Sequence, residues 1–443
     1  MIALILCVAL LVAAFIAGQR SLGAGCLVVL AAGYSYGIVR ANLITPASHF
    51  VFDSALIGLY ASFLWTKKQT LKPQNHALWV WLIIMVAWPL LLVFLPFQTL
   101  LISLVGLRGN IYLLPVLLIG SQLRSSDLRT LALGLGVLNG FAIAVGVAEY
   151  FMGLEHFFPY SAVTTILYSS WDGAGLLRIP STFANAHTYA LTMVDTIPFL
   201  FGYWAQKSTS SPRKILLLSG IASAFMGVIL ASTRQGMIAA GVVVMIAISS
   251  GKLGVLKRCI LALAISAIVF AAFHNERWQR YKELDKDTVT ERIGGSVNRT
   301  FLEIFEEYPM GNGLGGGGTS IPYFLESQLS KPIEVENEYG RMLLEQGIIG
   351  LLIWTAFILW FVTNRAGFVK DAWFAGRRMA WWLAIFSICS AVIGIGLLTA
   401  IPSTFLFLLA IGWTSVKPWE AQTTQVAAPR RVSVMPAVAA HMR

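Results

Sequence analysis

Charged residues are scarce in this chain of 443 residues. Asp, Glu, Lys and Arg together make up 12% of the sequence, about half of their share in soluble globular proteins. This scarcity excludes an ordinary soluble domain. The basic residues outnumber the acidic ones and give a net charge of +11, but most of them stand in short stretches between apolar runs rather than in one patch. The charge pattern therefore predicts no nucleic-acid partner.

Cysteine is also rare. All four cysteines lie in apolar runs or at their edges: Cys7, Cys26, Cys259 and Cys389. This arrangement excludes a disulfide framework and a metal site built on paired cysteines. We expect these side chains to act as small apolar core residues, and we predict no metal.

Apolar residues are what the chain has in abundance. They make up 57% of the sequence, and the mean hydropathy is +0.73. Apolar runs of about 17 to 25 residues recur, which is the length that crosses a bilayer as a helix. The sequence therefore predicts an all-α, polytopic membrane bundle of about 12–13 transmembrane helices. The expected spans are 2–18, 22–39, 51–65, 77–96, 109–123, 130–152, 188–204, 215–232, 237–250, 259–273, 348–364, 379–398 and 402–414.

The spans define one transmembrane catalytic domain over residues 1–414. A long polar stretch at 274–347 interrupts them and contains much of the polar chemistry of the chain. We expect it to form a cap with short helices over a membrane-embedded site. The tail at 415–443 is rich in Ala, Pro, Thr and Val, and it is predicted to be disordered.

The basic residues also predict an orientation. Most of the 32 lysines and arginines fall in alternate loops and in the tail, hence on one side of the membrane. By the positive-inside rule this side is the cytoplasm. The other side then receives 40–50, 97–108, 153–187, 233–236 and 274–347. ATP and nucleotide sugars are absent outside the cytoplasm, so the substrate is expected to be lipid-linked, exported or extracellular.

Arg234 is the first candidate functional residue. It stands in the turn Ala231–Gly236 between two apolar runs, where an arginine is costly unless it is paired or functional. Its guanidinium can form bidentate hydrogen bonds with a phosphate, so Arg234 is a candidate for binding a lipid phosphate or diphosphate. The alternative is an arginine that reaches from a hairpin tip to the lipid headgroups.

Three more candidates lie on the same predicted face. Arg178 and His187 precede the span at 188, and the N-terminal end of a helix favours anions. The alternative is an ordinary capped helix entry with a solvated histidine. Arg108 follows a leucine-rich segment, where it is either a second phosphate contact or a plain boundary arginine.

A last group of candidates comes directly before the span at 348. The segment 334–347 reads as a helix, with Glu336 and Asn337 near its N-terminus. That end of a helix favours an ionised carboxylate, which suits a base better than an acid. The alternative is helix capping and surface charge.

Several arginines and a carboxylate on one face match the needs of sugar transfer from a lipid diphosphate. The diphosphate is a good leaving group, so charge stabilisation can replace a general acid. The acceptor hydroxyl still needs a base. Direct attack on the anomeric carbon would invert its configuration.

Four segments carry a resemblance to a known family, and they are Arg178–Phe183, Ser232–Gly236, Tyr308–Gly315 and Glu336–Gly347. Together with a cap helix around Arg299, their order and spacing resemble the O-antigen ligase and polymerase superfamily of bacterial envelope glycosyltransferases. The resemblance covers roughly 175–365, and the rest of the chain matches by hydropathy only.

The resemblance implies a helical glycosyltransferase of the bacterial inner membrane that faces the periplasm and uses no metal, nucleotide or other cofactor. Its donor would be an undecaprenyl-diphosphate-linked glycan, and its acceptor a glycan or a lipid. Other membrane proteins of polysaccharide assembly are further expected partners. Arginines matching Arg234, and Arg299 or Arg292, would hold the diphosphate. Glu336 stands where ligases of this family usually have a histidine, which favours the exopolysaccharide-polymerase branch.

Two alternatives remain open. One is ligation of the glycan onto a lipid or protein acceptor, and the other is a polysaccharide transporter or flippase. A transporter is expected to show an inverted repeat and charges near the bilayer midplane. The sequence shows no convincing repeat, and few charges, such as Asp195 and Glu149, lie deep in the expected spans.

Overall fold

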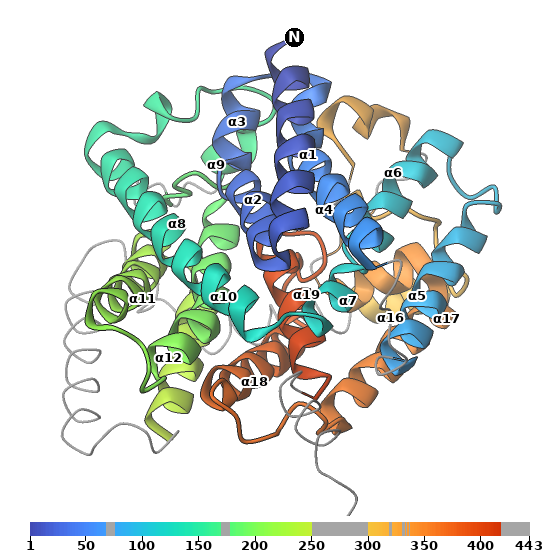
Figure 1. Ribbon diagram of the computed structural model, residues 1–443. Helices are drawn as coiled ribbons and strands as arrows, with labels where there is room; N and C mark the ends of the chain where they lie inside the picture. The colour runs from blue at the N-terminus through green and yellow to red at the C-terminus, as the bar shows by residue number, and fades with distance from the viewer. Residues whose placement is uncertain are drawn as a thin grey trace, which may run out of the picture.

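The computed structural model describes residues 1–67, 76–169, 178–249, 300–318, 321–329, 333, 335 and 337–417. Every element in these ranges is a helix (Figure 1), which confirms the all-α class. The first part of the chain forms α1 (Ile2–Arg20), α2 (Leu22–Tyr34), α3 (Tyr36–Asn42), η1 (Pro46–Phe50), α4 (Val51–Lys67), α5 (His76–Leu92), α6 (Leu100–Ile111), α7 (Val116–Ser121), α8 (Ser125–Met152), η3 (Leu154–His156) and α9 (Thr165–Ser169).

The second part of the chain supplies the helices around the candidate site. It forms α10 (Ala186–Trp204), α11 (Ser211–Ala231), α12 (Arg234–Ser249), α16 (Thr300–Glu307), η6 (Tyr323–Gln328), α17 (Glu338–Thr363), α18 (Phe374–Ser390) and α19 (Ser403–Thr414).

Several of these helices are long and apolar enough to cross a membrane, as in a multi-pass membrane protein. Six qualify within the described residues: Ile2–Arg20, Pro46–Thr66, Leu100–Ser121, Ser125–Met152, Ser211–Ala231 and Glu338–Thr363. The pair α2 and α3, bent by 44°, makes a seventh if it is one broken span. The helices α5, α12 and α19 are apolar but shorter.

Most expected spans coincide with helices in the described ranges, although fewer than 12–13 helices pass the test of length and hydropathy. The span at 379–398 is wrong in its second half, because α18 ends at Ser390 and residues 391–398 belong to a loop. The span at 259–273 lies outside the described residues. A second boundary also differs, because α6 begins at Leu100 rather than near residue 109. The side chain of Thr99 caps its first turn, and the leucine-rich residues that follow continue the helix.

The helices α19 and α10 lie in the interior. All twelve residues of α19 are buried, and so are most residues of α10. By contrast, α1 buries only Ala3, Cys7, Ala14 and Gly18. Its exposed apolar side chains suit a helix that faces lipid, where an apolar surface has no reason to be hidden. In Figure 1, α19 accordingly lies among α7, α10 and α18, near the centre of the bundle.

Part of the expected cap packs on α17. The helix α16 lies beside α17, and Ile304 is buried against Leu343 and Leu344 (Figure 1). This confirms a helix in the cap, although the side of the membrane on which it lies stays a prediction. Of the expected tail, only residues 415–417 are described.

The segment Pro309–Asn312 inserts into a break in α17. Gly347 has φ 67° and ψ −173°, which is not helical and favours glycine. The amide of Ile348 donates to the carbonyl of Pro309 at 3.0 Å, and the carbonyl of Leu344 accepts from the amide of Asn312 at 2.6 Å. In an unbroken helix the groups of Leu344 and Ile348 would bond to each other. The inserted segment therefore satisfies both groups while α17 bends.

Candidate functional site

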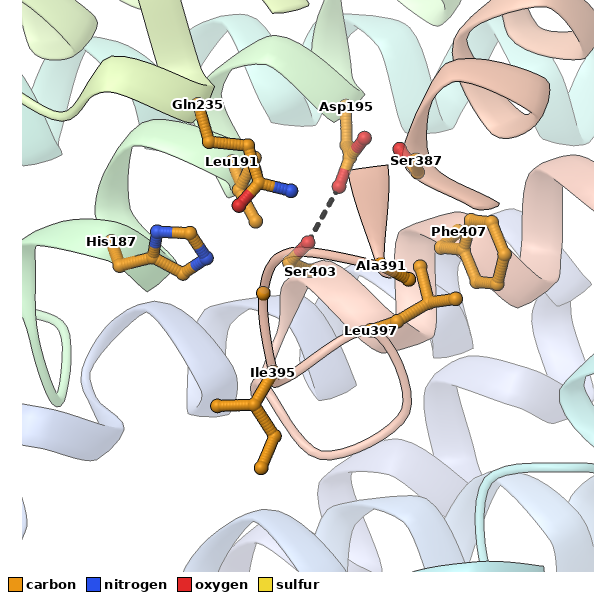
Figure 2. A pocket seen from close by; sticks show the side chains of 11 residues that line it. His187, Leu191, Asp195, Gln235, Ser387, Ala391, Ile395, Leu397, Ser403 and Phe407 are labelled. Atoms are coloured by element: carbon orange, nitrogen blue, oxygen red, sulfur yellow. Dashed lines mark hydrogen bonds between the residues drawn. The ribbon is translucent and has the colours of Figure 1, made fainter. Parts of the chain in front are cut away.

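A pocket lies between α10, α12, α18 and α19 (Figure 2). It has an empty volume of about 370 Å³, part of it open to solvent. Five polar side chains line it together with five apolar ones and one glycine. The lining residues are His187, Leu191, Asp195, Gln235, Ser387, Ala391, Gly394, Ile395, Leu397, Ser403 and Phe407.

One face of α10 supplies three of these side chains. His187, Leu191 and Asp195 are spaced four residues apart, so they follow one another along the helix. Asp195 accepts a hydrogen bond from the hydroxyl of Ser403 on α19, with 2.7 Å between Oγ and Oδ2 (Figure 2). This bond joins two walls of the pocket.

The segment before α10 is firmly anchored. Ser181 has a φ of 55°, its amide donates to Oε2 of Glu149 at 2.8 Å, and its hydroxyl donates to the carbonyl of Ala142 at 2.7 Å. Phe183 stacks on Tyr189, with 5.1 Å between ring centroids. Glu149, a charge deep in an expected span, thus holds the segment that leads into α10.

Arg178 lies at the start of that segment and acts on His187. The imidazole stands just ahead of the expected span at 188–204. Burial and the nearby guanidinium of Arg178 lower the pKa of His187, so this side chain is neutral at pH 7. Of these two predicted residues His187 lines the pocket, and Arg178 is near enough to affect its charge.

The start of α12 brings Arg234 to the same region. Ser232 adopts the left-handed conformation, with φ 50°, and α12 begins two residues later. A Cβ at Gly236 would come within 2.6 Å of the Cβ of Ala190, so only glycine permits this approach to α10. Gln235 lines the pocket, and its Nε2 donates to Oγ of Ser390 at 2.8 Å. Arg234, half-buried, is its direct neighbour.

The loop 391–402 forms another wall, and α17 holds it in place. The amide of Glu338 donates to the carbonyls of Ala391 and Gly394 at 3.0 and 3.1 Å. Its carboxylate accepts from the amide of Gly396 at 2.8 Å. Asn337 is buried and caps α17 by accepting from the amide of Gly340.

Asn337 therefore has a structural role, because it caps the helix that holds the loop of the pocket wall. The other predicted residues of this region, Glu336, Arg292 and Arg299, lie outside the described residues.

The sequence interpretation missed a fully buried ionic network behind this wall. Nε and Nη2 of Arg341 donate to Oε1 of Glu338 at 2.8 and 2.6 Å, and its Nη1 donates to Oε2 of Glu345 at 2.8 Å. All three side chains are 0% exposed. Asn110 on α6 donates to Glu345 at 2.7 Å and accepts from Gln346 at 2.8 Å. The spacing of three and four residues along 338–345 was the available signal, but it is equally typical of a surface helix.

Arg108 takes a different place from the other predicted residues. None of the three described candidate arginines lines the pocket. Arg234 is the direct neighbour of Gln235, and burial and Arg178 lower the pKa of His187, whereas the side chain of Arg108 lies between α6 and α4. Its Nε donates to Oδ2 of Asp53 at 2.7 Å, and its guanidinium lies 5.8 Å from the ring of Phe50. The side chain of Asp53 is 7% exposed and that of Arg108 29% exposed. This pair joins α6 to α4.

Arg108→Ala is therefore expected to lower the stability of the protein rather than its affinity for a phosphate ligand. Asp53 would be left nearly buried without its cation. In a double-mutant cycle with Asp53→Asn, measured by unfolding in detergent, we expect a coupling energy of about 1 kcal/mol. If Arg108 instead contacts a phosphate, Arg108→Ala will unfold like the wild type but bind a lipid diphosphate more weakly.

Four helices begin around the pocket. His187, Gln235 and Ser403 lie in the first turns of α10, α12 and α19, and the first residue of α17 bonds to the loop that forms a wall. Helix N-termini carry partial positive charge and unpaired amides, so they favour anions. Together with Arg178 and Arg234 they give the region the chemistry of an anion site.

Comparisons with known protein families and with curated protein sequences gave no match to this chain. The interpretation of the pocket therefore depends on its own residues.

Proposed function

We propose that the protein is a glycosyltransferase of the bacterial inner membrane. It transfers a glycan from an undecaprenyl-diphosphate-linked donor to an acceptor hydroxyl on the periplasmic face. The observation that supports this proposal most is the meeting of α10 and α12 at one pocket, which brings Arg234 and Gln235 to the same region as Arg178 and His187. These two helix ends and two arginines provide the positive charge that a diphosphate needs.

In this proposal the arginines bind the donor and stabilise the departing diphosphate. Charge develops on the leaving oxygens in the transition state, and guanidinium groups fixed beforehand lower its energy. Neutral His187 adds a hydrogen-bonding group without further charge. The acceptor attacks the anomeric carbon directly, so its configuration inverts.

Polymerisation of repeat units is the form of the reaction that we favour. The reason is Glu336, an acidic residue at a position where ligases of the resembled family usually have a histidine. Glu336 is the base predicted from the sequence, and the pocket offers a second carboxylate, Asp195.

A reconstituted transfer assay tests this proposal. Purified protein in lipid vesicles receives an undecaprenyl-diphosphate-linked repeat unit without an added acceptor, and the products are separated by size on a gel. A polymerase is expected to give a ladder of longer lipid-linked chains. A ligase is expected to release the lipid diphosphate only when a lipid or protein acceptor is added.

A transporter would produce neither result. If the protein instead carries the intact lipid-linked unit across the vesicle membrane without releasing diphosphate, the proposed reaction is wrong. Vesicles containing the Arg234→Ala variant serve as the matched control for contaminating activities.

A further inference from the structure

The carboxylate of Asp195 faces the pocket from the middle of α10. Ser403 is its one hydrogen-bond donor among the described residues, and this bond occupies Oδ2 at 2.7 Å. Figure 2 shows Oδ1 pointing away from Ser403. Ser403 is also the first residue of α19, whose N-terminal end stabilises negative charge. The hydrogen bond to Oδ2 therefore fixes the orientation of the carboxylate, and Oδ1 can accept a proton or a further hydrogen bond.

The other titratable groups nearby suit a proton acceptor less well. Glu338 is fully buried, and both of its oxygens already accept hydrogen bonds, from Arg341 and from the amide of Gly396. On taking a proton, His187 would become a cation beside Arg178, whereas Asp195 would become neutral. Asp195 is the carboxylate that combines pocket access with fixed orientation.

We propose that Asp195, held by Ser403, binds the acceptor hydroxyl in this pocket and takes its proton during transfer. This inference rests on the proposed function, and it assigns to Asp195 the role that the sequence alone gives to Glu336. The ligand class is an alcohol, here a hydroxyl of the acceptor sugar. Gln235 lines the same pocket, and its side-chain amide nitrogen is held by Ser390.

The step balances within the two substrates. The acceptor O–H gives its proton to Oδ1 of Asp195 while its oxygen forms a bond to the anomeric carbon. The bond from that carbon to the diphosphate oxygen breaks, and the electron pair leaves with the lipid diphosphate. Water then receives the proton from Asp195, which restores the carboxylate.

The test uses the full-length protein in lipid vesicles with the lipid-linked repeat unit. Asp195→Asn keeps the size of the side chain and its bond from Ser403 but cannot take a proton. We expect kcat to fall by about 10²- to 10⁴-fold, while stabilisation of the protein against heat by undecaprenyl diphosphate stays unchanged. Asp195→Ala is expected to regain part of its activity in added formate, which supplies a small carboxylate.

Companion variants separate the outcomes. Ser403→Ala is expected to lower kcat less than Asp195→Asn, and Ser403→Thr to restore it, because Ser403 acts only through Asp195. The control Glu155→Gln changes an exposed carboxylate on η3 and is expected to match the wild type. If Asp195→Asn does not fold, Asp195→Glu replaces it, and we expect at least a tenfold loss of kcat with the stabilisation by diphosphate intact.

Specific results would overturn the inference. One is turnover by Asp195→Asn close to that of the wild type. Another is a loss of turnover in Glu336→Gln that Asp195→Asn does not show. A third is loss of the stabilisation by diphosphate in Asp195→Asn, which would make Asp195 part of the donor site. A wild-type protein that transfers no glycan would refute the proposed function itself, and this inference with it.

Discussion

Arg341→Ala is expected to lower the free energy of unfolding by about 3–5 kcal/mol, the range found when one partner of a buried ion pair is removed. The guanidinium stands between Glu338 and Glu345, and all three side chains are 0% exposed. Without it, two carboxylates remain buried with no cation within 4 Å among the described residues. Asn110 and the amide of Gly396 each offer a hydrogen bond, but neither offers a positive charge.

The measurement is the thermal and denaturant unfolding of purified variants in the same detergent. The stability of Arg341→Lys is expected to lie between those of the wild type and Arg341→Ala, because a single ammonium cannot hydrogen-bond both carboxylates as a guanidinium does. The triple variant Arg341→Met, Glu338→Gln and Glu345→Gln is expected to recover most of the loss, since no uncompensated charge remains. Arg129→Ala, at an exposed position, is the matched control. Equal stabilities of Arg341→Ala and Arg129→Ala would show that the network contributes nothing.

Arg234→Ala is expected to reduce transfer by about 10²- to 10³-fold, the usual effect of removing one group that stabilises transition-state charge. The expectation depends on the proposed function and on the position of Arg234 beside Gln235 at the pocket. Arg234→Lys is expected to recover only part of the activity, because lysine does not bind a diphosphate with two parallel hydrogen bonds.

The transfer assay and the stabilisation by undecaprenyl diphosphate measure this effect together. A phosphate clamp requires that Arg234→Ala lose both the turnover and the stabilisation. Its thermal unfolding without ligand is expected to stay close to that of Arg129→Ala, since Arg234 is half-buried at a helix start rather than in the core. An arginine that merely reaches the headgroups would leave turnover and stabilisation intact.

The membrane character of the fold could be predicted well from the sequence, because the length and hydropathy of a span are local properties. Most expected runs coincide with helices in the described ranges, and the exception is 391–398, which is a loop. The boundary errors come from non-local packing. The sequence placed 97–108 outside the spans on the outer face, whereas Leu100–Ile111 is helical. A Cβ at Gly106 would overlap the amide nitrogen of Gly315, so α6 is packed directly against the glycine-rich turn.

The candidate site could be predicted only in part. Arg178, His187 and Arg234 fall in one region because they lie just before or at the starts of α10 and α12, which pack together. Arg108 was a reasonable candidate, but its partner, Asp53, is 55 residues away in the chain, and no local pattern connects them. The spacing of Glu338, Arg341 and Glu345 was visible, but their complete burial depends on α6 and on the loop 391–402. Asp195 was noticed as a deep charge, and only the fold shows that it faces a pocket.

The break in α17 has a consequence for biosynthesis. If the amide of Ile348 and the carbonyl of Leu344 entered the bilayer without hydrogen-bond partners, each unsatisfied group would cost several kcal/mol of free energy. Both groups are satisfied by Pro309–Asn312, which the ribosome makes more than thirty residues before them. The matching backbone is therefore already present when α17 leaves the translocon, and the bend can close as the helix is inserted.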